Sequence, residues 1–452
     1  MSVPRVAIVG AGPSGLFAAS SLLAGHPGVL IDVLDRLPTP FGLLRYGVAP
    51  DHTSIKSVQA RLAGPFASGR VRFFGLVELG RTVTRDELVA GYDAVVYAAG
   101  ASEDRRLGIP GEDLPGSRAA RDFVAWYSGH PDAEPQPLAG VHTAVAFGVG
   151  NVAVDVARIL LLDAAALAAT DMPEPVLAEL SAHRIADVWV VGRRGPEHAT
   201  FTTTELRELL TLEGVQPVLH DPLPDDPPDA DRRVRGNLAA LREAAAREVP
   251  GARARLHLAF WRRPAELRGS GAVESVVLER TASDGAGGVV GTGEREEVVA
   301  QMVLRAIGYR GKPLPGVPFD ERAGVVPNAG GRVVDVDGSP RVGEYVVGWI
   351  KRGPIGVIGT NKSDAAATVS LLLEDLASGL LGAPTGPDAG ELLAAQGLAA
   401  SSFADWEAID AAERARGAGR GRERTKVETW HALTDVIRFG RTGGPLEREP
   451  EA

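Results

Sequence analysis

The chain has 452 residues, a net charge of −10 and no long basic block, so it is long enough for two or three domains and is unsuited to general nucleic-acid binding. Hydrophobic residues make up 44% of the chain and charged residues 23%, which is the balance of a globular protein. Because cysteine is absent, disulfides, iron–sulfur clusters and redox thiol pairs are excluded, and any redox chemistry must belong to a bound cofactor.

The first 25 residues do not predict a secretory signal. Their apolar run is interrupted by Gly10, Gly12, Pro13 and Gly15. No uninterrupted apolar stretch reaches the length of about eighteen residues that a membrane helix needs. We therefore expect a cytoplasmic protein with no membrane partner.

The stretch RVAIVGAGPSG predicts a strand ending at Val9, a glycine turn and a helix, which is a dinucleotide-binding pattern. We call residues 10–15 the first glycine turn. Gly10 permits the tight turn, Gly12 lets a pyrophosphate approach the backbone, and Gly15 allows the helix to pack closely on the strand. The next predicted strand ends at Asp35, whose carboxylate suits a ribose with a free 2′-hydroxyl and repels a 2′-phosphate.

A second pattern of the same kind lies in the middle of the chain. The strand AVAF leads to Gly148 and Gly150, with Ala153 at the third glycine position, and a helical stretch follows. We call residues 148–153 the second glycine turn. The next predicted strand, DVWVVGRR, ends at Arg193 and Arg194, and guanidinium groups bind phosphate oxygens in pairs. The second site is therefore expected to select NADP(H).

The two patterns together predict two different cofactors. One site suits a dinucleotide that keeps its 2′-hydroxyl and the other suits one that carries a 2′-phosphate, and FAD with NADPH fits that pair. Glu205, on the predicted helix TTTELREL, is expected to meet the ribose or nicotinamide end of NADPH. No motif predicts a metal site.

Matching strand-then-glycine segments at 92–100 and 301–311 flank the second pattern. They predict an α/β protein with two Rossmann-like nucleotide-binding domains, in which the NADP domain is inserted into the FAD domain. The expected parts are 1–102 for the first part of the FAD domain, 103–310 for the NADP domain, and 311–452 for the second part with a C-terminal helical segment.

Three stretches are expected to carry no chemistry. Residues 221–233 predict an exposed Pro/Asp loop, and residues 282–296 predict a glycine-rich hairpin connection. Residues 414–424 predict a basic, flexible segment before a short C-terminal helix, ETWHALTDVIRFG.

Two further stretches are specific to a known family. LPTPFGLLRYGVAPDH (37–52) and EYVVGWIKRGPIGVIGTNKSDA (344–365), together with GVGNVAVDVARIL, VGRRGP and FTTTELREL, closely resemble adrenodoxin reductase and the bacterial ferredoxin–NADP reductases. The resemblance runs from residue 5 to about residue 375 and is weaker beyond. It implies a two-domain FAD enzyme of the glutathione-reductase-like fold that carries electrons between NADPH and a small iron–sulfur ferredoxin.

The resemblance also implies particular contacts. Those to FAD fall at Gly10, Gly12, Pro13, Ser14, Gly15, Asp35, Leu43, Val77, Trp349, Gly356, Val357 and Ile358. Those to NADP fall at Arg105, Gly148, Gly150, Asn151, Val152, Ala153, Arg193, Arg194, Glu205 and Gly356.

His52, Asp155 and Glu205 are the candidate catalytic residues, the first two for proton handling beside the nicotinamide. The alternatives are a structural loop role for His52, with Asp51 or Thr53 capping the next helix, and an ordinary helix carboxylate for Asp155.

The stretch GPIGVIG offers consecutive backbone N–H groups near a helix start, which suit the N1–O2 edge of a flavin. Trp349 is expected to cover the flavin ring, with a plain core aromatic as the alternative. Three residues depart from the family pattern: Val149 replaces a polar residue, Asp35 replaces Glu, and Ile355 replaces Thr. Because backbone groups bind the phosphate, Val149 is expected to leave that contact intact.

The predicted function is electron transfer from NADPH through FAD to an acidic ferredoxin, by a protein expected to be a monomer. Since this chain is acidic as well, docking requires a local basic patch. Its candidates are Arg232, Arg233, Arg235, Arg262, Arg263, Arg310, Lys312, Lys351 and Arg352. Two alternatives are an NADPH-dependent flavin oxidase or monooxygenase, and a non-catalytic FAD-binding electron-transfer or sensor module.

Overall fold

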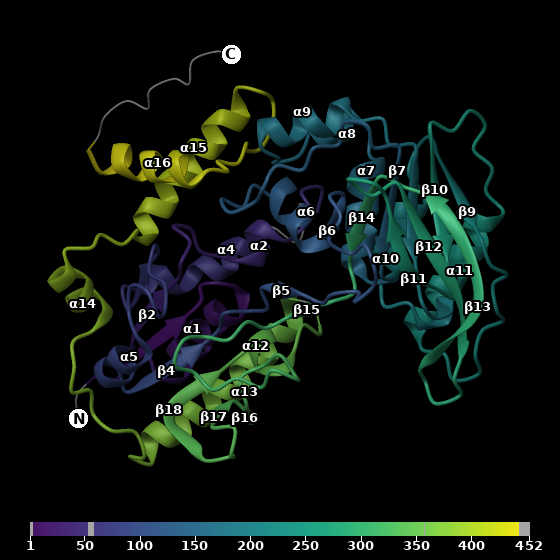
Figure 1. Ribbon diagram of the computed structural model, residues 1–452. Coiled ribbons are helices and arrows are strands. Elements are labelled where there is room, and N and C mark those ends of the chain that lie inside the picture. The colour runs from purple at the N-terminus through teal and green to yellow at the C-terminus, as the bar shows by residue number, and fades with distance from the viewer. Residues whose placement is uncertain (1–2, 53–57, 357, 443–452) are drawn as a thin grey trace. The chain divides into compact units, whose positions relative to one another are not determined.

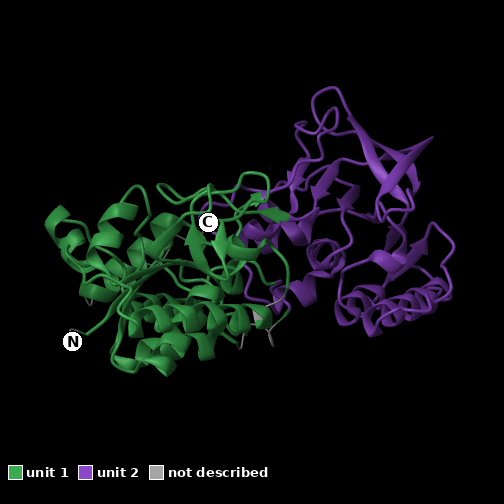
Figure 2. Cartoon of the chain, turned by 90° about the horizontal axis from the view of Figure 1, so that it is seen from below, with its two compact units in different colours: residues 1–48, 52–103, 309–452 green, residues 49–51, 104–308 purple. Residues whose placement is uncertain are grey.

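The computed structural model describes residues 3–52, 58–356 and 358–442. The chain divides into two compact units (Figure 2): unit 1 comprises Met1–Val48, His52–Glu103 and Tyr309–Ala452, and unit 2 comprises Ala49–Asp51 and Asp104–Gly308. Each unit is built on a largely parallel sheet covered by helices, so the predicted α/β class is confirmed (Figure 1).

Unit 1 contains a seven-stranded sheet in the order β16-β17-β18-β4-β1-β2-β3. Its strands are β1 (Arg5–Val9), β2 (Leu30–Leu34), β3 (Val71–Phe74), β4 (Ala94–Tyr97), β16 (Asn328–Ala329), β17 (Arg332–Val334) and β18 (Pro340–Val346). The strands from β18 to β3 are parallel, and β17 and β16 add antiparallel partners at one edge.

Helices cover both faces of this sheet. They are α1 (Pro13–Gly25), α2 (Leu43–Tyr46), α4 (Val58–Ala63), α5 (Arg85–Gly91), α12 (Trp349–Arg352), α13 (Ile358–Ala377), α14 (Ala389–Gln396), α15 (Phe403–Ala418) and α16 (Trp430–Thr442). Val6 and Ile8 of β1 face a core with α1, α13, α15 and α16, whereas Ala7 and Val9 face α5 and α14. Alternate side chains of β1 therefore pack into the hydrophobic layers on opposite faces of the sheet.

Unit 2 contains a six-stranded parallel sheet in the order β6-β14-β7-β8-β10-β9. Its strands are β6 (Ser117–Ala119), β7 (Thr143–Phe147), β8 (Asp187–Val191), β9 (Val215–Leu219), β10 (Ala254–Ala259) and β14 (Met302–Arg305). An antiparallel meander follows β10 in the chain and consists of β11 (Arg262–Arg268), β12 (Ser275–Ser283) and β13 (Val289–Val299). A separate two-stranded sheet contains β5 (Glu103–Asp104) and β15 (Tyr309–Arg310).

The two faces of the unit 2 sheet have different cover. Ala144 and Val188 point to a core shared with the helices, whereas Val145 and Phe147 point to a core shared with the meander. The helices are α6 (Ala120–Tyr127), α7 (Asn151–Leu161), α8 (Ala164–Ala168), α9 (Glu174–Ala182), α10 (Thr203–Leu210) and α11 (Arg232–Ala245).

The expected short C-terminal helix is confirmed as α16. The prediction of a flexible segment at 414–424 is wrong in part, because α15 continues to Ala418 and Arg424 is buried against Asp410 at 2.6 Å. The predicted loop 221–233 begins with the buried Asp221, whose carboxylate pairs with Arg262. Within the described ranges, every helix is too short or too polar to cross a membrane.

Candidate dinucleotide-binding sites

The first glycine turn has the predicted strand–turn–helix geometry. Gly10 has φ +114°, and a Cβ there would lie 2.5 Å from the Ala98 carbonyl oxygen. A Cβ at Gly15 would lie 2.1 Å from the Gly10 carbonyl oxygen, so both positions exclude side chains. Gly12 is the N-cap of α1 and provides no capping side chain, and Pro13 is its first helical residue. The N–H groups at the start of α1 are thus available to an anion.

Asp35 braces this turn. Its carboxylate accepts hydrogen bonds from the Ala11 N–H at 2.8 Å and from the Leu37 N–H at 2.9 Å. Its backbone carbonyl accepts the N–H of the buried Val77 at 2.9 Å. Burial raises the pKa of the Asp35 carboxyl, while the two backbone donors act in the opposite direction. Each carboxylate oxygen still has a lone pair with which to accept a ribose hydroxyl.

The segment that follows β2 packs on the first glycine turn, backbone to backbone. Phe41 donates its N–H to the Ala11 carbonyl at 2.8 Å. Gly42 has φ +48°, and a Cβ there would lie 2.9 Å from the Gly12 Cα. Leu43, which begins α2, is 40% exposed and offers an apolar surface beside this contact.

A third glycine approaches the same turn from the start of α12. Gly348 has φ +77°, and a Cβ there would lie 2.2 Å from Ser14 Oγ. Its N–H donates to Asp364 at 2.6 Å. Trp349 is the first residue of α12, and its ring centroid lies 5.8 Å from that of Tyr309. Among the described residues, the buried Nε1–H of Trp349 has no hydrogen-bond acceptor.

The structure describes two of the three residues expected to contact FAD at 356–358. Gly356 has φ +90° and is exposed, and a Cβ there would crowd Thr360. Val357 lies outside the described residues, and Ile358 begins α13. Ile355, a departure from the family pattern, is 73% exposed, so it belongs to no core.

The second glycine turn repeats the geometry in unit 2. Gly148 has φ +132°, and a Cβ there would lie 2.2 Å from the Ala306 carbonyl oxygen. Gly150 is the N-cap of α7 and provides no capping side chain. Ala153 is fully buried, and Val152 packs at the edge of the unit 2 core. The start of α7 is thus available to an anion, as the start of α1 is.

The start of α7 is joined to the start of α10. Asn151 accepts the Thr202 N–H at 2.8 Å through its side-chain oxygen, and the Val149 carbonyl accepts the Thr200 N–H at 2.8 Å. Thr202 in turn caps α10 by accepting the Glu205 N–H at 3.3 Å. The backbone carbonyl of Val149 thus forms a hydrogen bond, although the Val149 side chain departs from the family pattern.

Arg193 and Arg194 follow β8 with their backbones fixed, and their side chains have no partner among the residues that the structure describes. The Arg193 carbonyl accepts the Thr281 hydroxyl at 2.7 Å, and the Arg194 carbonyl accepts the Trp261 N–H at 3.3 Å. Arg105 is exposed as well. Within the described part of the chain, none of these three guanidinium groups forms an ion pair or a hydrogen bond. The unit that holds the second glycine turn therefore contains three cations without a partner in the described ranges.

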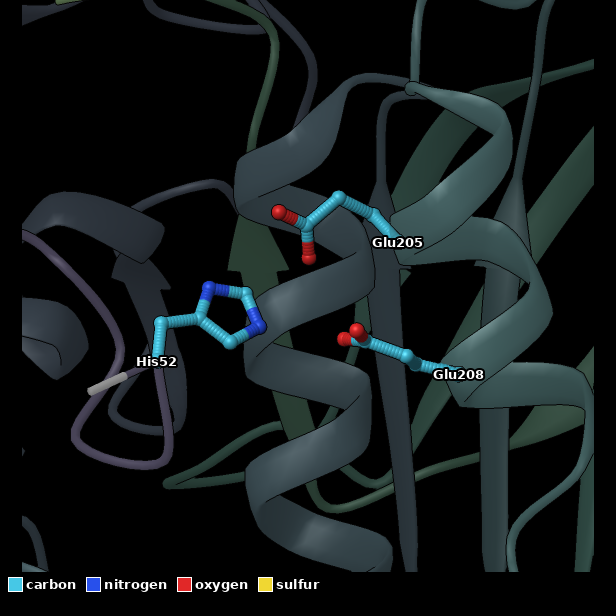
Figure 3. A group of neighbouring side chains, drawn as sticks. All are labelled: His52, Glu205 and Glu208. Atoms are coloured by element: carbon cyan, nitrogen blue, oxygen red, sulfur yellow. The ribbon is translucent and has the colours of Figure 1, made fainter. Parts of the chain in front are cut away.

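Sequence reasoning missed Arg158, which forms ion pairs with four carboxylates of unit 2, those of Asp51, Asp155, Glu205 and Glu208. It lies in α7 with a side chain that is only 2% exposed. Its Nε lies 2.7 Å from an Asp51 oxygen, its Nη2 2.9 Å from Asp155, and its Nη1 3.1 Å from Glu205. Figure 3 shows Glu205 on α10, with Glu208 one turn further along. An arginine on the apolar helix α7, three residues after Asp155, was the signal in the sequence.

Arg158 therefore brings together two of the three candidate catalytic residues, Asp155 and Glu205. The third, His52, is partly buried, belongs to unit 1 and follows Asp51 directly in the chain. Thr53, one of the two alternative caps for the next helix, lies outside the described residues.

No protein-family model matches the chain. The NADPH-ferredoxin reductase FprA of Mycobacterium tuberculosis is 47% identical to it over 96% of this chain and 98% of its own length. The mitochondrial NADPH:adrenodoxin oxidoreductase of Homo sapiens is 43% identical over 94% of this chain and 90% of its own length.

A solved structure supports the same relation. The structure of Mycobacterium tuberculosis FprA in complex with NADPH matches with a TM-score of 0.90 and 46% identity, over 97% of this chain and all of that one. This similarity extends over nearly the whole chain. The chain therefore belongs to the oxidoreductase family that contains the NADPH-ferredoxin reductases and the NADPH:adrenodoxin oxidoreductases.

Proposed function

We propose that this protein passes electrons from NADPH, through FAD, to a ferredoxin-type iron–sulfur protein. One observation carries the proposal: a single chain holds two dinucleotide turns, of which one is followed by Asp35 and the other by Arg193 and Arg194. The names of the relatives, NADPH-ferredoxin reductase and NADPH:adrenodoxin oxidoreductase, support the same donor and the same class of acceptor.

Unit 1 is the FAD unit in this proposal. Gly12, Gly42 and Gly348 meet around the start of α1, and a Cβ on Gly42 or Gly348 would collide with the first glycine turn. This close backbone packing fits a pyrophosphate held by backbone N–H groups. Asp35 fits a ribose hydroxyl, and the unmatched indole N–H of Trp349 fits an acceptor supplied by the cofactor. When bound, FAD takes electrons in a pair and releases them singly, which a one-electron partner requires.

Unit 2 is the NADPH unit. The start of α7 supplies N–H groups for the pyrophosphate, while Arg193 and Arg194 supply charge for the 2′-phosphate. Arg105 adds a further cation for the phosphates. Because the carbonyl groups of residues 193 and 194 are held by the meander and its entry, the two guanidinium groups start from a fixed backbone, which reduces the entropy lost on binding.

Arg158 has a positioning role in this unit. Its contacts hold Asp155 and Glu205 in fixed orientations, and its contact with Asp51 fixes the chain one residue before His52. We propose that Glu205 contacts the ribose or nicotinamide end of NADPH, and that His52 and Asp155 handle protons beside it. His52→Gln and Asp155→Asn should each change the pH profile of kcat and leave the KM for NADPH within about threefold.

Docking of the partner is proposed at the start of α11. Several cationic candidates are already neutralised by neighbours: Arg262 by Asp221, Arg263 by Glu279, Arg310 by Glu321, Lys351 by Asp364. Arg232 and Arg235 are exposed and lie one turn apart on α11, and in the described chain neither has an ion pair. Lys312 is exposed and likewise unpaired there. An acidic ferredoxin fits the two α11 arginines.

The direct test mixes the purified protein with NADPH and a [2Fe–2S] ferredoxin under anaerobic conditions and follows ferredoxin reduction. Rapid reduction supports the proposal. NADPH consumption that occurs only with oxygen would instead indicate an oxidase, and no consumption at all would indicate a non-catalytic module. We further propose that the protein acts as a monomer in the cytoplasm, which sedimentation and cell fractionation would check.

A further inference from the structure

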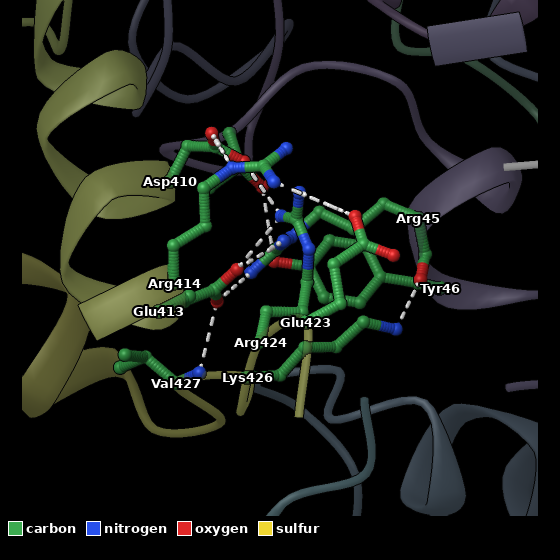
Figure 4. Close-up of polar contacts among 10 residues, drawn as sticks. Arg45, Tyr46, Asp410, Glu413, Arg414, Glu423, Arg424, Lys426 and Val427 are labelled. Carbon is green, nitrogen blue, oxygen red and sulfur yellow. Dashed lines mark hydrogen bonds and ion pairs between the residues drawn. The ribbon is translucent and has the colours of Figure 1, made fainter. Parts of the chain in front are cut away.

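A buried group of charges joins the C-terminal helices to the segment that faces the first glycine turn (Figure 4). Arg45 of α2 is 3% exposed, and Glu413 of α15 is fully buried. Arg45 donates from Nη1 to Glu413 Oε2 at 3.0 Å and from Nη2 to Oε1. The two residues are 368 positions apart in the chain. This pair therefore connects the two ends of unit 1.

The chain after α15 reinforces the pair from a second side. Val427 donates its N–H to Glu413 Oε1 at 2.9 Å, and Arg424 lies 3.4 Å from the other carboxylate oxygen. Lys426 donates from Nζ to the backbone carbonyl of Arg45 at 2.7 Å. Both the side chain and the backbone of Arg45 are thus held by residues of the C-terminal part.

Trp406, also on α15, contacts the same segment at its start. Its ring lies 5.0 Å from the Arg45 guanidinium carbon and 5.5 Å from the Phe41 ring, edge to face. Phe41 has φ +83°, a left-handed conformation that is costly for a bulky residue and persists only where its surroundings enforce it. Directly after it, Gly42 makes the close backbone approach to Gly12. The C-terminal part therefore packs on a strained backbone segment that contacts the first glycine turn.

Stability alone does not explain a buried ion pair at this place. Removing both charges from water is costly, and apolar side chains of similar volume often hold two helices together as well. A bidentate pair adds a defined distance and orientation. We propose that Glu413 is a positioning residue for FAD: through Arg45 it sets the segment 41–47 against the first glycine turn, so that the C-terminal part controls how firmly the cofactor is retained. This inference rests on the proposed FAD site in unit 1.

The test compares Glu413→Gln with Glu344→Gln in the holoprotein. Glu344 is a matched control, because it is 1% exposed in unit 1 and is bound by Arg85 through both oxygens, yet it contacts no part of the segment 41–47. FAD release is followed by the rise of its fluorescence on dilution, and folding is followed by far-UV circular dichroism. We expect Glu413→Gln to release FAD at least about tenfold faster than wild type and Glu344→Gln less than about threefold faster.

Further variants separate positioning from general damage. Glu413→Asp keeps the charge and should restore much of the retention. Lys426→Met removes the hydrogen bond to the Arg45 carbonyl and should give a smaller increase in release; it also decides the question if Glu413→Gln does not fold. NADP+ affinity should be unchanged in all of them, because unit 2 contains none of these residues. The inference would be overturned if the Glu413 and Glu344 variants released FAD equally fast. If Glu413→Gln fails to fold, an unchanged rate of FAD release in Lys426→Met would overturn it. A wild-type protein that contains no FAD would instead refute the proposed function.

Discussion

We propose that the choice between NADPH and NADH rests on Arg193 and Arg194. Of the arginines in unit 2, many are neutralised: Arg255 pairs with Asp187 at 2.6 Å, and Arg207 with Glu243 at 2.6 Å. Residues 193 and 194 follow a Rossmann-like strand and, within the described ranges, have no such partner. Leaving two cations unpaired at this position is the expected design for a phosphate ligand.

The change Arg193→Ala with Arg194→Ala should therefore raise the KM for NADPH by roughly 10- to 100-fold, since hydrogen bonds between charged groups contribute about 1.5–3 kcal/mol. The KM for NADH should stay within about twofold, because NADH carries no 2′-phosphate. Steady-state kinetics with both donors measures this. Arg184→Ala, which removes another exposed arginine of unit 2, is the control. An equal loss with NADPH and NADH would contradict the assignment.

Asp104 supplies a prediction of pH-dependent stability. Burial raises the pKa of its carboxyl to about 6, although Arg121 at 3.2 Å and Arg305 act against this and Asp122 adds to it. The folded state binds the Asp104 proton more tightly than the unfolded state does, so this proton stabilises the fold. The contribution is fully present below pH 3.8 and is lost as pH rises through about 6.

Asp104→Asn removes this titration. Relative to wild type, the variant should be unchanged in stability near pH 4 and more stable by up to about 3 kcal/mol near pH 8, from about two pKa units at about 1.4 kcal/mol each. Denaturant unfolding at the two pH values measures the difference. Asp229→Asn, at an exposed position of the same unit, should show no such pH dependence. A stabilisation that is the same at both pH values would be inconsistent with a buried titrating carboxyl.

At the scale of elements, α11 has a charge pattern that opposes its own stability. Its first turn contains Arg232, Arg233 and Arg235 and no acidic residue, although the positive end of a helix disfavours cations. The N-cap Asp231 offsets part of this by accepting the Val234 N–H at 2.8 Å. Such a pattern favours a role in binding an acidic partner.

Arg232→Glu with Arg235→Glu should raise the KM for ferredoxin by about tenfold or more at low salt, and the difference should shrink as salt screens it. Reduction of ferricyanide, a small acceptor that needs no docking surface, should not change. Arg322→Glu, at an exposed position of unit 1, serves as the control. If ferricyanide reduction fell in parallel with ferredoxin reduction, α11 would not be a docking element.

Turns and helices were predictable where neighbouring residues in the sequence determine them. The turn at Gly10 and the turn at Gly148 follow from backbone conformations that only glycine adopts readily, and the helices after them follow from apolar periodicity. The end of α15 was not predictable. Residues 414–424 are rich in arginine and glycine, which favours a flexible segment, but Arg424 is buried by its contacts with Asp410 and Glu413.

At the scale of the whole molecule, the contacts that the sequence could not predict are those between distant residues. Arg158 meets Asp51 across 107 positions, and Arg45 meets Glu413 across 368. Each charged residue taken alone predicts a solvated surface position, because burying a charge costs free energy unless an oppositely charged residue from another part of the chain pairs with it. Composition and motif spacing thus predicted the two glycine turns, but they did not predict the buried ion pairs that join distant segments of each unit.

We infer that one chain holds FAD and takes electrons from NADPH in preference to NADH. An anaerobic titration of the purified protein tests this, with the absorbance of the oxidised flavin as the signal. We expect a bound flavin spectrum that bleaches rapidly with NADPH and poorly with NADH. A protein without flavin, or a flavin that bleaches with neither nucleotide or equally well with both, would contradict it.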